Sequence, residues 1–362
     1  MNRQARSLAW AATAALASLA VAGCRADRGK ASALSADATG TLTVLDWAGY
    51  EDTVMFATFH QKYPKVTVSV AFGESDADIF GKMKAGADAC VFHPYTGWQH
   101  FYVRDGLVME LDTTRLSNWS QIPARFKALG QVDGKQYFIP WDWGFTSVLY
   151  RTDKVPGGID SWAALLDPKF RGHISTWDDG PGNVTVASYI KGWDETRLTD
   201  EQLAEIERMW TAQRKLNRFY WTGEPELVQG MAAGEIWVAY AWQGAYATLL
   251  GQGVPVAYAQ PKEGRNSWVG LYGISPKCQN ADLAYAFLDE KLAAQVGINL
   301  INAFYYGHVN PNATPGVTDT NVVKALALND PSVLERTRFT PQVSESERDH
   351  FGQLWARVKA AK

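Results

Sequence analysis

Cysteine is scarce in this sequence, and so are long apolar runs. Only Cys24, Cys90 and Cys278 occur among 362 residues, too few for a small fold held by a disulfide framework. After an N-terminal run that ends at Gly23, no apolar stretch approaches the roughly 20 residues that a membrane-spanning helix needs. We therefore expect a globular protein, and the length suggests two domains of ordinary size.

Neither positive nor negative charge predominates in the sequence. The formal net charge is −3 at pH 7, and the 35 Lys and Arg residues are scattered along the chain. Binding to a phosphate backbone requires a basic stripe. The sequence therefore gives no reason to expect a nucleic-acid partner.

The motifs of common enzyme classes are missing as well. The sequence contains no H-E-x-x-H, G-x-S-x-G, G-x-x-x-x-G-K or C-x-x-C. Asp178 and Asp179 are neighbours in sequence, whereas the paired carboxylates of glycosidases face each other across a bond at about 5 Å or more. We expect a binding protein rather than an enzyme, without a cofactor and without a metal.

The N-terminus has the pattern of a secretory signal. Arginines at positions 3 and 6 precede an apolar run that starts at Leu8 and ends in Val21-Ala22-Gly23-Cys24. A basic start, a short apolar stretch and small residues before a cysteine are typical of bacterial lipoprotein signals. We expect residues 1–23 to be removed and Cys24 to carry lipid, which would anchor the protein to the periplasmic or extracytoplasmic face of a membrane. The alternative is a buried or spanning helix with an incidental cysteine.

Residues 24–40 are small and polar and predict a flexible linker between the lipid and the first strand. With Cys24 lipidated, Cys90 and Cys278 remain in an oxidising compartment. A disulfide between them is permitted there, and two buried thiols are the alternative.

Strands and helices are expected to alternate from residue 41 onward. Strands are predicted at 41–45, 66–72 and 89–92, with helices at 53–62 and 79–85 between them. This order predicts an α/β fold with a parallel sheet, in which ligands bind beyond the carboxyl ends of the strands. Further strands are expected at 147–150, 173–176, 236–241, 254–259 and 268–275, and helices at 161–166, 199–213, 281–299 and 344–359. Turn formers dominate residues 177–182, which are therefore predicted to form a loop.

Aromatic residues are abundant, with 15 each of Trp, Tyr and Phe. Many must be core residues, since large rings dominate core burial. Several, however, follow predicted strands: Trp47 and Tyr50 come after the first, and Tyr95 and Trp98 come after the third together with His93. Their position beyond strand ends indicates a ligand site.

A set of short segments carries a family resemblance through its order and spacing. The segments are Asp46-Trp47-Ala48-Gly49-Tyr50, Glu74-Ser75, Lys82-Met83-Lys84, Ile139-Pro140, Trp143-Gly144, Ser161-Trp162-Ala163, Pro168-Lys169-Phe170-Arg171-Gly172, Gly234-Glu235, Trp242-Gln243-Gly244, Pro261-Lys262-Glu263-Gly264 and Pro311-Asn312. Together they resemble the spermidine/putrescine-binding proteins of bacterial ABC importers, over almost the whole mature length.

The resemblance implies a two-lobed periplasmic-binding-protein fold of type II, in which each lobe is a mainly parallel sheet flanked by helices and crossing hinge strands join the lobes. Lobe 1 would comprise residues 41–143 plus 269–316, and lobe 2 residues 144–268 plus 317–362. It further implies a monomer that captures a small cationic, polyamine-like amine and delivers it to a cognate ABC permease.

The ligand of that family lies between the lobes, held by aromatic faces and carboxylates. An ammonium group over a Trp or Tyr face gains roughly 0.5 to 2 kcal/mol, and a carboxylate must then compensate the desolvated charge. The residues of this chain that match the family's ligand contacts are Trp47, Tyr50, Tyr95, Asp179, Trp242 and Trp268.

Four positions depart from the family. His93 replaces a serine, Gly182 replaces a second acid, Gly270 replaces an aspartate, and His308 stands near a tyrosine of the family. With two carboxylates fewer, a mono-cationic or zwitterionic amine such as a betaine or an amino acid is an alternative ligand. A protonated His93 or His308 would then meet the carboxylate, so both are candidate ligand-binding residues.

A ferric-iron-binding protein of the same fold is a rival interpretation. It is suggested by the adjacent Tyr305 and Tyr306 together with His93 and His308, since tyrosinate and imidazole suit a hard cation. The surrounding segment 303–311 nevertheless continues into Pro311-Asn312, where the amine-binding resemblance is kept.

Overall fold

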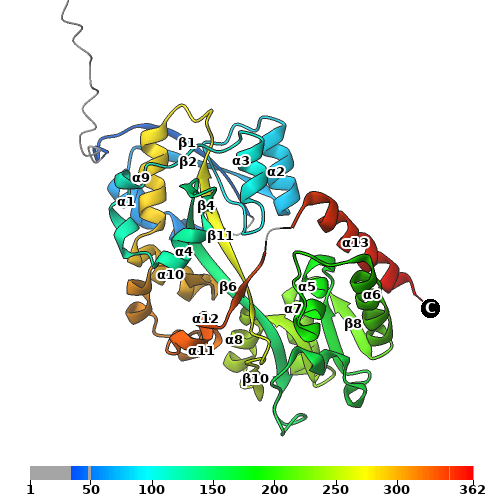
Figure 1. Cartoon of the computed structure of the whole chain (residues 1–362). Helices are drawn as coiled ribbons and strands as arrows, with labels where there is room; N and C mark the ends of the chain where they lie inside the picture. Colours follow the sequence, from blue (N-terminus) through cyan, green and yellow to red (C-terminus); the bar gives the residue numbers. More distant parts are fainter. Residues whose placement is uncertain (1–33, 48–49, 342, 362) are drawn as a thin grey trace, which may run out of the picture. The chain divides into compact units, whose positions relative to one another are not determined.

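A computed structural model describes residues 34–47, 50–341 and 343–361 of the chain (Figure 1). The predicted signal peptide 1–23 and the predicted lipidation site Cys24 lie outside the described residues. Within the described ranges, no helix combines the length and the apolar character that crossing a membrane requires.

A single large mixed sheet organises residues 34–361. Along its main path the strand order is β2-β1-β3-β11-β6-β9-β7-β8, and three short strands pair with it at the side. The strands on the path are β1 Gly40–Trp47, β2 Val66–Gly73, β3 Val91–Phe92, β6 Phe138–Arg151, β7 Ile174–Trp177, β8 Asn217–Trp221, β9 Val238–Trp242 and β11 Asn266–Ile274. The others are β10 Val256–Tyr258, β12 Gly307–His308 and β13 Arg338–Phe339 in this sheet, and the separate hairpin β4 Gln131–Val132 with β5 Lys135–Gln136.

The first half of the sheet confirms the predicted alternation. β1 pairs in parallel with both β2 and β3, so the carboxyl ends of all three strands meet at one edge. α1 (Ala57–Lys62) and α2 (Asp76–Lys84) fill the two crossovers. Trp47 ends β1, and Tyr95 follows β3 by three residues, which places both rings at that edge.

Two long antiparallel strands, β6 and β11, join the two halves (Figure 1). β6 is buried along its first 12 residues, far beyond the short strand predicted at 147–150. Its sequence, FIPWDWGFTSVLYR, is almost continuously apolar, as expected of a strand covered on both faces. β11 lies between β3 and β6, so it connects the first half of the sheet to the second.

The second half of the sheet contains β9, β7 and β8. β9 pairs antiparallel with β6 and parallel with β7, and β7 pairs in parallel with β8. The helix predicted at 199–213 is α6 (Asp200–Arg214), which Thr199 and Gln202 start with a reciprocal capping box.

Two secondary-structure predictions need correction. The segment expected to be a loop at 177–182 instead opens α5 (Gly180–Lys191), because Asp179 caps the helix and Pro181 stands in its first turn, where its missing N–H costs nothing. The single helix predicted at 281–299 is two helices, α9 (Ala281–Lys291) and α10 (Ala294–Phe304). The remaining helices are α3 Gln99–Arg104, α4 Ala124–Leu129, α7 Glu224–Ala232, α8 Gln243–Gly251, α11 Thr320–Ala325, α12 Pro331–Glu335 and α13 Glu345–Ala360.

Two hydrophobic cores underlie this sheet. The larger surrounds the first half and extends to Leu249 of α8 and Val322 of α11, whereas the smaller lies around Trp162, Trp210 and Val358 in the second half. Two cores joined by crossing strands are the two-lobed type II fold that was expected. Since Leu249 and Val322 fall in predicted lobe 2, the residue boundaries given above for the lobes stay a prediction.

Cys90 and Cys278 form a disulfide, with their Cα atoms 4.4 Å apart. Cys90 lies directly before β3, and Cys278 follows β11, so the bond fastens two neighbouring strands of the first half. Of the two outcomes left open by the sequence, the structure therefore has the disulfide.

Candidate functional site

A cavity of about 530 Å³ lies where the two halves of the sheet meet. Its wall combines aromatic rings with a few polar side chains. The lining residues are Trp47, Tyr50, Glu74, Ser75, Asp76, Tyr95, Thr96, Trp98, Thr146, Trp177, Asp179, Pro181, Gly182, Thr185, Tyr240, Trp242, Asn266, Trp268, Tyr306, Thr340 and Arg348. Six of the predicted site residues are therefore brought together: Trp47, Tyr50, Tyr95, Asp179, Trp242 and Trp268.

The first half and the crossing strand supply a row of rings in contact. The centroid of Tyr95 lies 4.9 Å from that of Trp47 and 5.1 Å from that of Trp268, and Tyr306 continues the row 4.9 Å from Trp268. Tyr50 stacks beside Tyr306 at 6.4 Å. Gly144 makes room for this arrangement, because a Cβ at that position would collide with the indole of Trp268 on the paired strand.

The second half contributes a separate group of rings. Trp177 ends β7 and Trp242 ends β9, and their ring centroids are 5.1 Å apart with a steep angle of 71° between the planes. Tyr240 lies two residues before Trp242 and also lines the cavity. Aromatic rings from both halves thus line the same cavity. The faces of such rings attract a cation electrostatically, and the attraction is stronger where water is excluded.

Asp179 is the acidic residue that the second half contributes to the cavity wall. Its Oδ2 accepts the N–H of Gly182 at 2.6 Å as the cap of α5, and burial raises the pKa of its carboxyl to about 6. A side chain at position 182 would collide with this carboxylate and with the Tyr240 hydroxyl. With glycine at 182, Asp179 is the acid that the start of α5 contributes to the cavity wall.

Asp76 is the acid of the first half, and the sequence did not single it out. It opens α2 directly after the capping residue Ser75, and its Oδ1 accepts the backbone N–H of Tyr95 at 2.8 Å. Burial raises the pKa of Asp76 to about 6 as well. Glu74 also lines the cavity but is exposed to solvent, where water screens its charge.

One cation lines the cavity, the guanidinium of Arg348 on α13. It lies over the ring of Trp98, 4.4 Å from the centroid, and its Nη2 donates to the carbonyl of Gly97 at 3.3 Å. Its Nε has no hydrogen-bond partner among the described residues. Its charge lowers the pKa of both Asp76 and Asp179, although burial has the larger effect on each.

The structure does not bring His93 to the cavity. Its imidazole is fully buried behind Tyr50, where Nδ1 lies 2.6 Å from Asp46 Oδ1 and Nε2 lies 3.6 Å from Asp142 Oδ1. Burial alone would lower the pKa of His93, but the two carboxylates outweigh it and raise the pKa to about 9. Tyr50 connects this buried group to the cavity, since its hydroxyl donates to Asp142 Oδ2 at 2.5 Å.

His308 also lies away from the cavity. Its Nε2 donates to the carbonyl of Lys291 at 2.8 Å, and its Nδ1 accepts the N–H of Asn310 at 3.1 Å. Burial lowers the pKa of His308 to about 4, so its imidazole is neutral and occupied. Neither histidine is placed to meet a ligand carboxylate, because both rings are held by their own buried partners.

At Gly270, where the family has an aspartate, the neighbouring space is filled by another carboxylate. Gly270 pairs with Asp142 across β11 and β6, and a Cβ on Gly270 would collide with the Asp142 carboxylate and the His93 ring. A carboxylate therefore occupies this space after all, but it is fully buried and does not line the cavity.

The four residues that suggested a rival iron site do not share the aromatic cavity, since Tyr306 is the one member of the four that lines it. Among the described residues, no group of three or more His, Cys, Asp and Glu side chains is arranged to hold a metal ion. Tyr306 lines the aromatic cavity, whereas the adjacent Tyr305 ends α10 in a left-handed conformation with φ of 59°.

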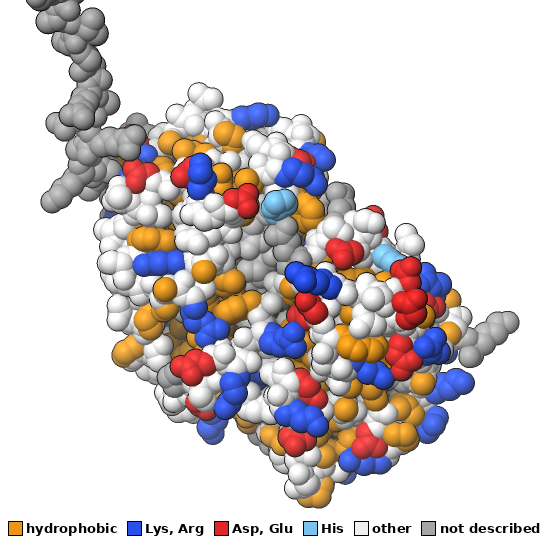
Figure 2. Space-filling view, viewed as in Figure 1, with side chains coloured by type: hydrophobic (Ala, Val, Ile, Leu, Met, Phe, Trp, Pro, Cys, Tyr) orange, Lys and Arg blue, Asp and Glu red, His pale blue; other side chains and the backbone are white. Residues whose placement is uncertain are grey.

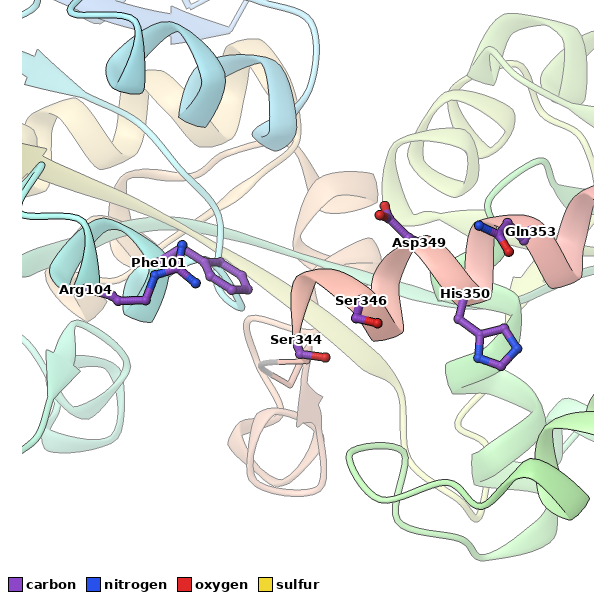
Figure 3. Close-up of a pocket in the computed structure, with 7 residues that line it drawn as sticks. All are labelled: Phe101, Arg104, Ser344, Ser346, Asp349, His350 and Gln353. Carbon is purple, nitrogen blue, oxygen red and sulfur yellow. The ribbon is translucent and has the colours of Figure 1, made fainter.

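A second hollow, of about 800 Å³, opens between α3 and α13 (Figure 3). Figure 3 shows Phe101 and Arg104 of α3 on one side and, from the start of α13 onward, Ser344, Ser346, Asp349, His350 and Gln353 on the other. This hollow has one aromatic ring and one acid. It lacks the enclosing rings that favour a cation, so the smaller aromatic cavity is the better candidate site.

Several lining residues were missed by sequence reasoning. Trp177 belongs to the segment that the sequence predicts to be a loop, and the sequence indicates Tyr306 only as a candidate iron ligand. The capping residue Ser75 before a helical pattern could have pointed to Asp76. No local pattern marks Arg348, since it reaches the cavity only through the packing of the C-terminal helix.

Known proteins share this fold and sequence pattern. The sequence profile of bacterial extracellular solute-binding proteins matches residues 54–329. The chain is 25% identical to the putrescine-binding periplasmic protein PotF of Escherichia coli, over 89% of this chain and 92% of that protein. It is 26% identical to a putrescine/cadaverine-binding protein of Pseudomonas aeruginosa, over 91% and 96% of the two chains.

Solved structures agree on the fold. The spermidine/putrescine ABC transporter substrate-binding protein PotD of Streptococcus pneumoniae superposes with a TM-score of 0.76 at 17% identity, covering 89% of this chain and 99% of that one. At this identity the likeness concerns the fold alone.

Proposed function

We propose that this chain, which belongs to the family of bacterial extracellular solute-binding proteins, is the ligand-capturing component of an ABC importer for a small cationic amine of the polyamine type. The observation that carries the proposal is the cavity, where rings and one half-buried acid from each half of the sheet converge. The names of the relatives, which bind putrescine or cadaverine, support the ligand class.

The geometry accounts for capture in two steps. An ammonium group entering the cavity exchanges water for the faces of Trp47, Tyr95 and Trp268, and Asp179 compensates its charge. Since Asp179 and Trp242 come from the second half and Trp47 and Tyr95 from the first, the ligand binds best when both sets surround it. Binding therefore shifts the population toward a closed arrangement of the lobes.

The same proposal includes where the protein acts. It is tethered by lipid on Cys24 at the extracytoplasmic face of a membrane, works as a monomer, and presents the closed form to its permease. Charged side chains of both signs are interspersed over the face shown in Figure 2, which suits a soluble carrier domain on such a tether.

Replacing Asp179 by Asn tests the proposal. Asparagine keeps the capping hydrogen bond to Gly182 but removes the negative charge. Titration calorimetry with 1,4-diaminobutane, putrescine, should show affinity at least about 30-fold lower, since a desolvated ammonium loses its partner.

Asp319→Asn is the matched control. Asp319 caps α11 in the same way but is exposed and does not line the cavity. It should leave the affinity unchanged. Equal affinity of wild type and Asp179→Asn, or no binding of any amine by the wild type, would refute the proposed function.

A further inference from the structure

The charge of the aromatic cavity is set by three enclosed groups. Asp76 and Asp179 bring two negative charges from opposite halves, and Arg348 brings one positive charge from α13. No other Lys or Arg lines the cavity among the described residues. The enclosed charge is therefore one negative unit, with the exposed Glu74 adding a screened charge at the rim.

Arg348 is held in place from both sides. Its helix, α13, packs against α5 and α6 of the second half, whereas its guanidinium rests on Trp98 and the carbonyl of Gly97 in the first half. Among the described residues, no ion pair within 4 Å joins Arg348 to Asp76 or Asp179, and its charge acts on both carboxylates over a longer distance. The acids each keep an oxygen for a ligand, because Asp76 and Asp179 use one oxygen apiece for a backbone N–H.

The guanidinium of Arg348 affects how many positive charges a bound ligand can carry. Each ammonium group of a ligand is attracted by Asp76 and Asp179 and repelled by Arg348, and the repulsion grows with every further positive charge. The first ammonium neutralises the enclosed charge, and a second can use Glu74 at the rim. A third has no carboxylate left.

We propose that Arg348 is a specificity-determining residue that limits the ligand to one or two positive charges, so that the protein selects monoamines and diamines over triamines such as spermidine. The inference rests on the proposed function, since it assumes that an amine binds in the aromatic cavity. It adds which members of the amine class are taken.

The test is a ligand series that differs in charge. Butylamine, 1,4-diaminobutane and spermidine carry one, two and three positive charges, and their affinities are measured by calorimetry at one low ionic strength. The wild type should bind 1,4-diaminobutane more tightly than spermidine. In Arg348→Gln, the ratio of the spermidine dissociation constant to that of 1,4-diaminobutane should fall at least about tenfold, because one unit of repulsion is removed.

Two further variants separate the cavity charge from other effects. Arg348→Lys keeps the positive charge and should keep the wild-type ratio. Arg357→Gln removes a charge from the same helix, where Arg357 pairs with Glu207 on the surface, and should also leave the ratio unchanged. A thermal unfolding midpoint close to that of the wild type shows that each variant is folded.

The outcomes distinguish this inference from the proposed function. If the wild type binds amines but Arg348→Gln leaves the ratio unchanged, the inference fails and the proposed function stands. If 4-aminobutyrate binds the wild type more tightly than 1,4-diaminobutane and Arg348→Gln abolishes that preference, the guanidinium meets a ligand carboxylate, and the inference is overturned. If no amine binds, both are refuted.

Discussion

Asp179 is both a helix cap and part of the wall of the candidate site, since its carboxylate caps α5 and also lines the cavity. In the other half, Asp76 stands in the first turn of α2, directly after the capping residue Ser75, and lines the same cavity. The N-terminus of a helix favours a negative charge, which offsets part of the cost of burying each acid. One backbone N–H holds each carboxylate in the cavity wall.

This placement predicts a pH dependence of amine binding. Burial raises the pKa of Asp76 and Asp179 to about 6, so both are ionised at pH 7 and take up protons below pH 6, whereas an aliphatic amine stays charged throughout. Affinity should be level between pH 7 and 8 and at least about tenfold lower at pH 5. Calorimetry in buffers of matched ionic strength checks this.

Asp179→Asn serves as the comparison for this pH profile, since it removes one of the two titrating groups and should flatten the fall. Wild-type affinity that is the same at pH 5 and pH 7 would contradict the assignment of these acids to the ligand.

For single residues of the candidate site, the sequence predicts the aromatic side chains that line the cavity better than the polar ones. Trp47, Tyr95 and Trp242 could be assigned because each lies at or just after the end of a strand, and strand ends meet at one edge of a sheet. His93 has the same sequence position but turns into the core, because Asp46 and Asp142 hold it there. That difference depends on contacts between residues far apart in the chain, which no local pattern records.

Among the elements, the helices and strands with a clear period or cap were predictable. The capping box at Thr199 fixed the start of α6, and apolar β-rich residues fixed β1 and β2. The start of α5 was missed because Gly180, Pro181 and Gly182 are turn formers that the first turn of a helix also tolerates. The length of β6 was missed because a strand buried on both faces shows no alternation.

The disulfide between the segments flanking β3 and β11 predicts a stability effect without a binding effect. It joins residues 188 apart in sequence, so losing it frees the unfolded chain and should cost roughly 2–5 kcal/mol of unfolding free energy. The Cys90→Ser, Cys278→Ser double variant should unfold at lower urea concentration than the wild type. Its amine affinity should be unchanged, because neither cysteine lines the cavity.

Reductant provides the internal control for this prediction. It should lower the unfolding midpoint of the wild type to that of the double variant and leave the double variant unaffected. A wild type whose midpoint does not move, although thiol titration shows both cysteines reduced, would contradict a stabilising role for the bond.

For the whole molecule, two lobes that share a cavity predict a change of shape on binding. Small-angle X-ray scattering of the wild type should show a smaller radius of gyration with saturating 1,4-diaminobutane than without it. At the same ligand concentration, Asp179→Asn binds less ligand and should therefore show a smaller decrease of the radius of gyration than the wild type. An identical radius with and without saturating ligand in the wild type would argue against capture by closure.

The family resemblance predicts the two-lobed architecture, and the family match supports it. The predicted residue boundaries of the lobes do not coincide with the membership of the two cores. Residues such as Val322 pack into the larger core although they follow the second crossing in sequence. The last part of the chain contacts elements that are distant in sequence. β13 pairs with β11, and α13 packs on α5 and α6 of the second half.

The place of β11 has a consequence for biosynthesis. This strand lies between β3 and β6 in the sheet, yet of the other strands of this sheet only β12 and β13 follow it in the chain. β3 and β6 therefore cannot be joined through β11 until residue 274 has left the ribosome. For about three quarters of its synthesis, the nascent polypeptide therefore lacks the piece that completes its framework. A product truncated before Asn266 should be recovered as a protease-sensitive chain.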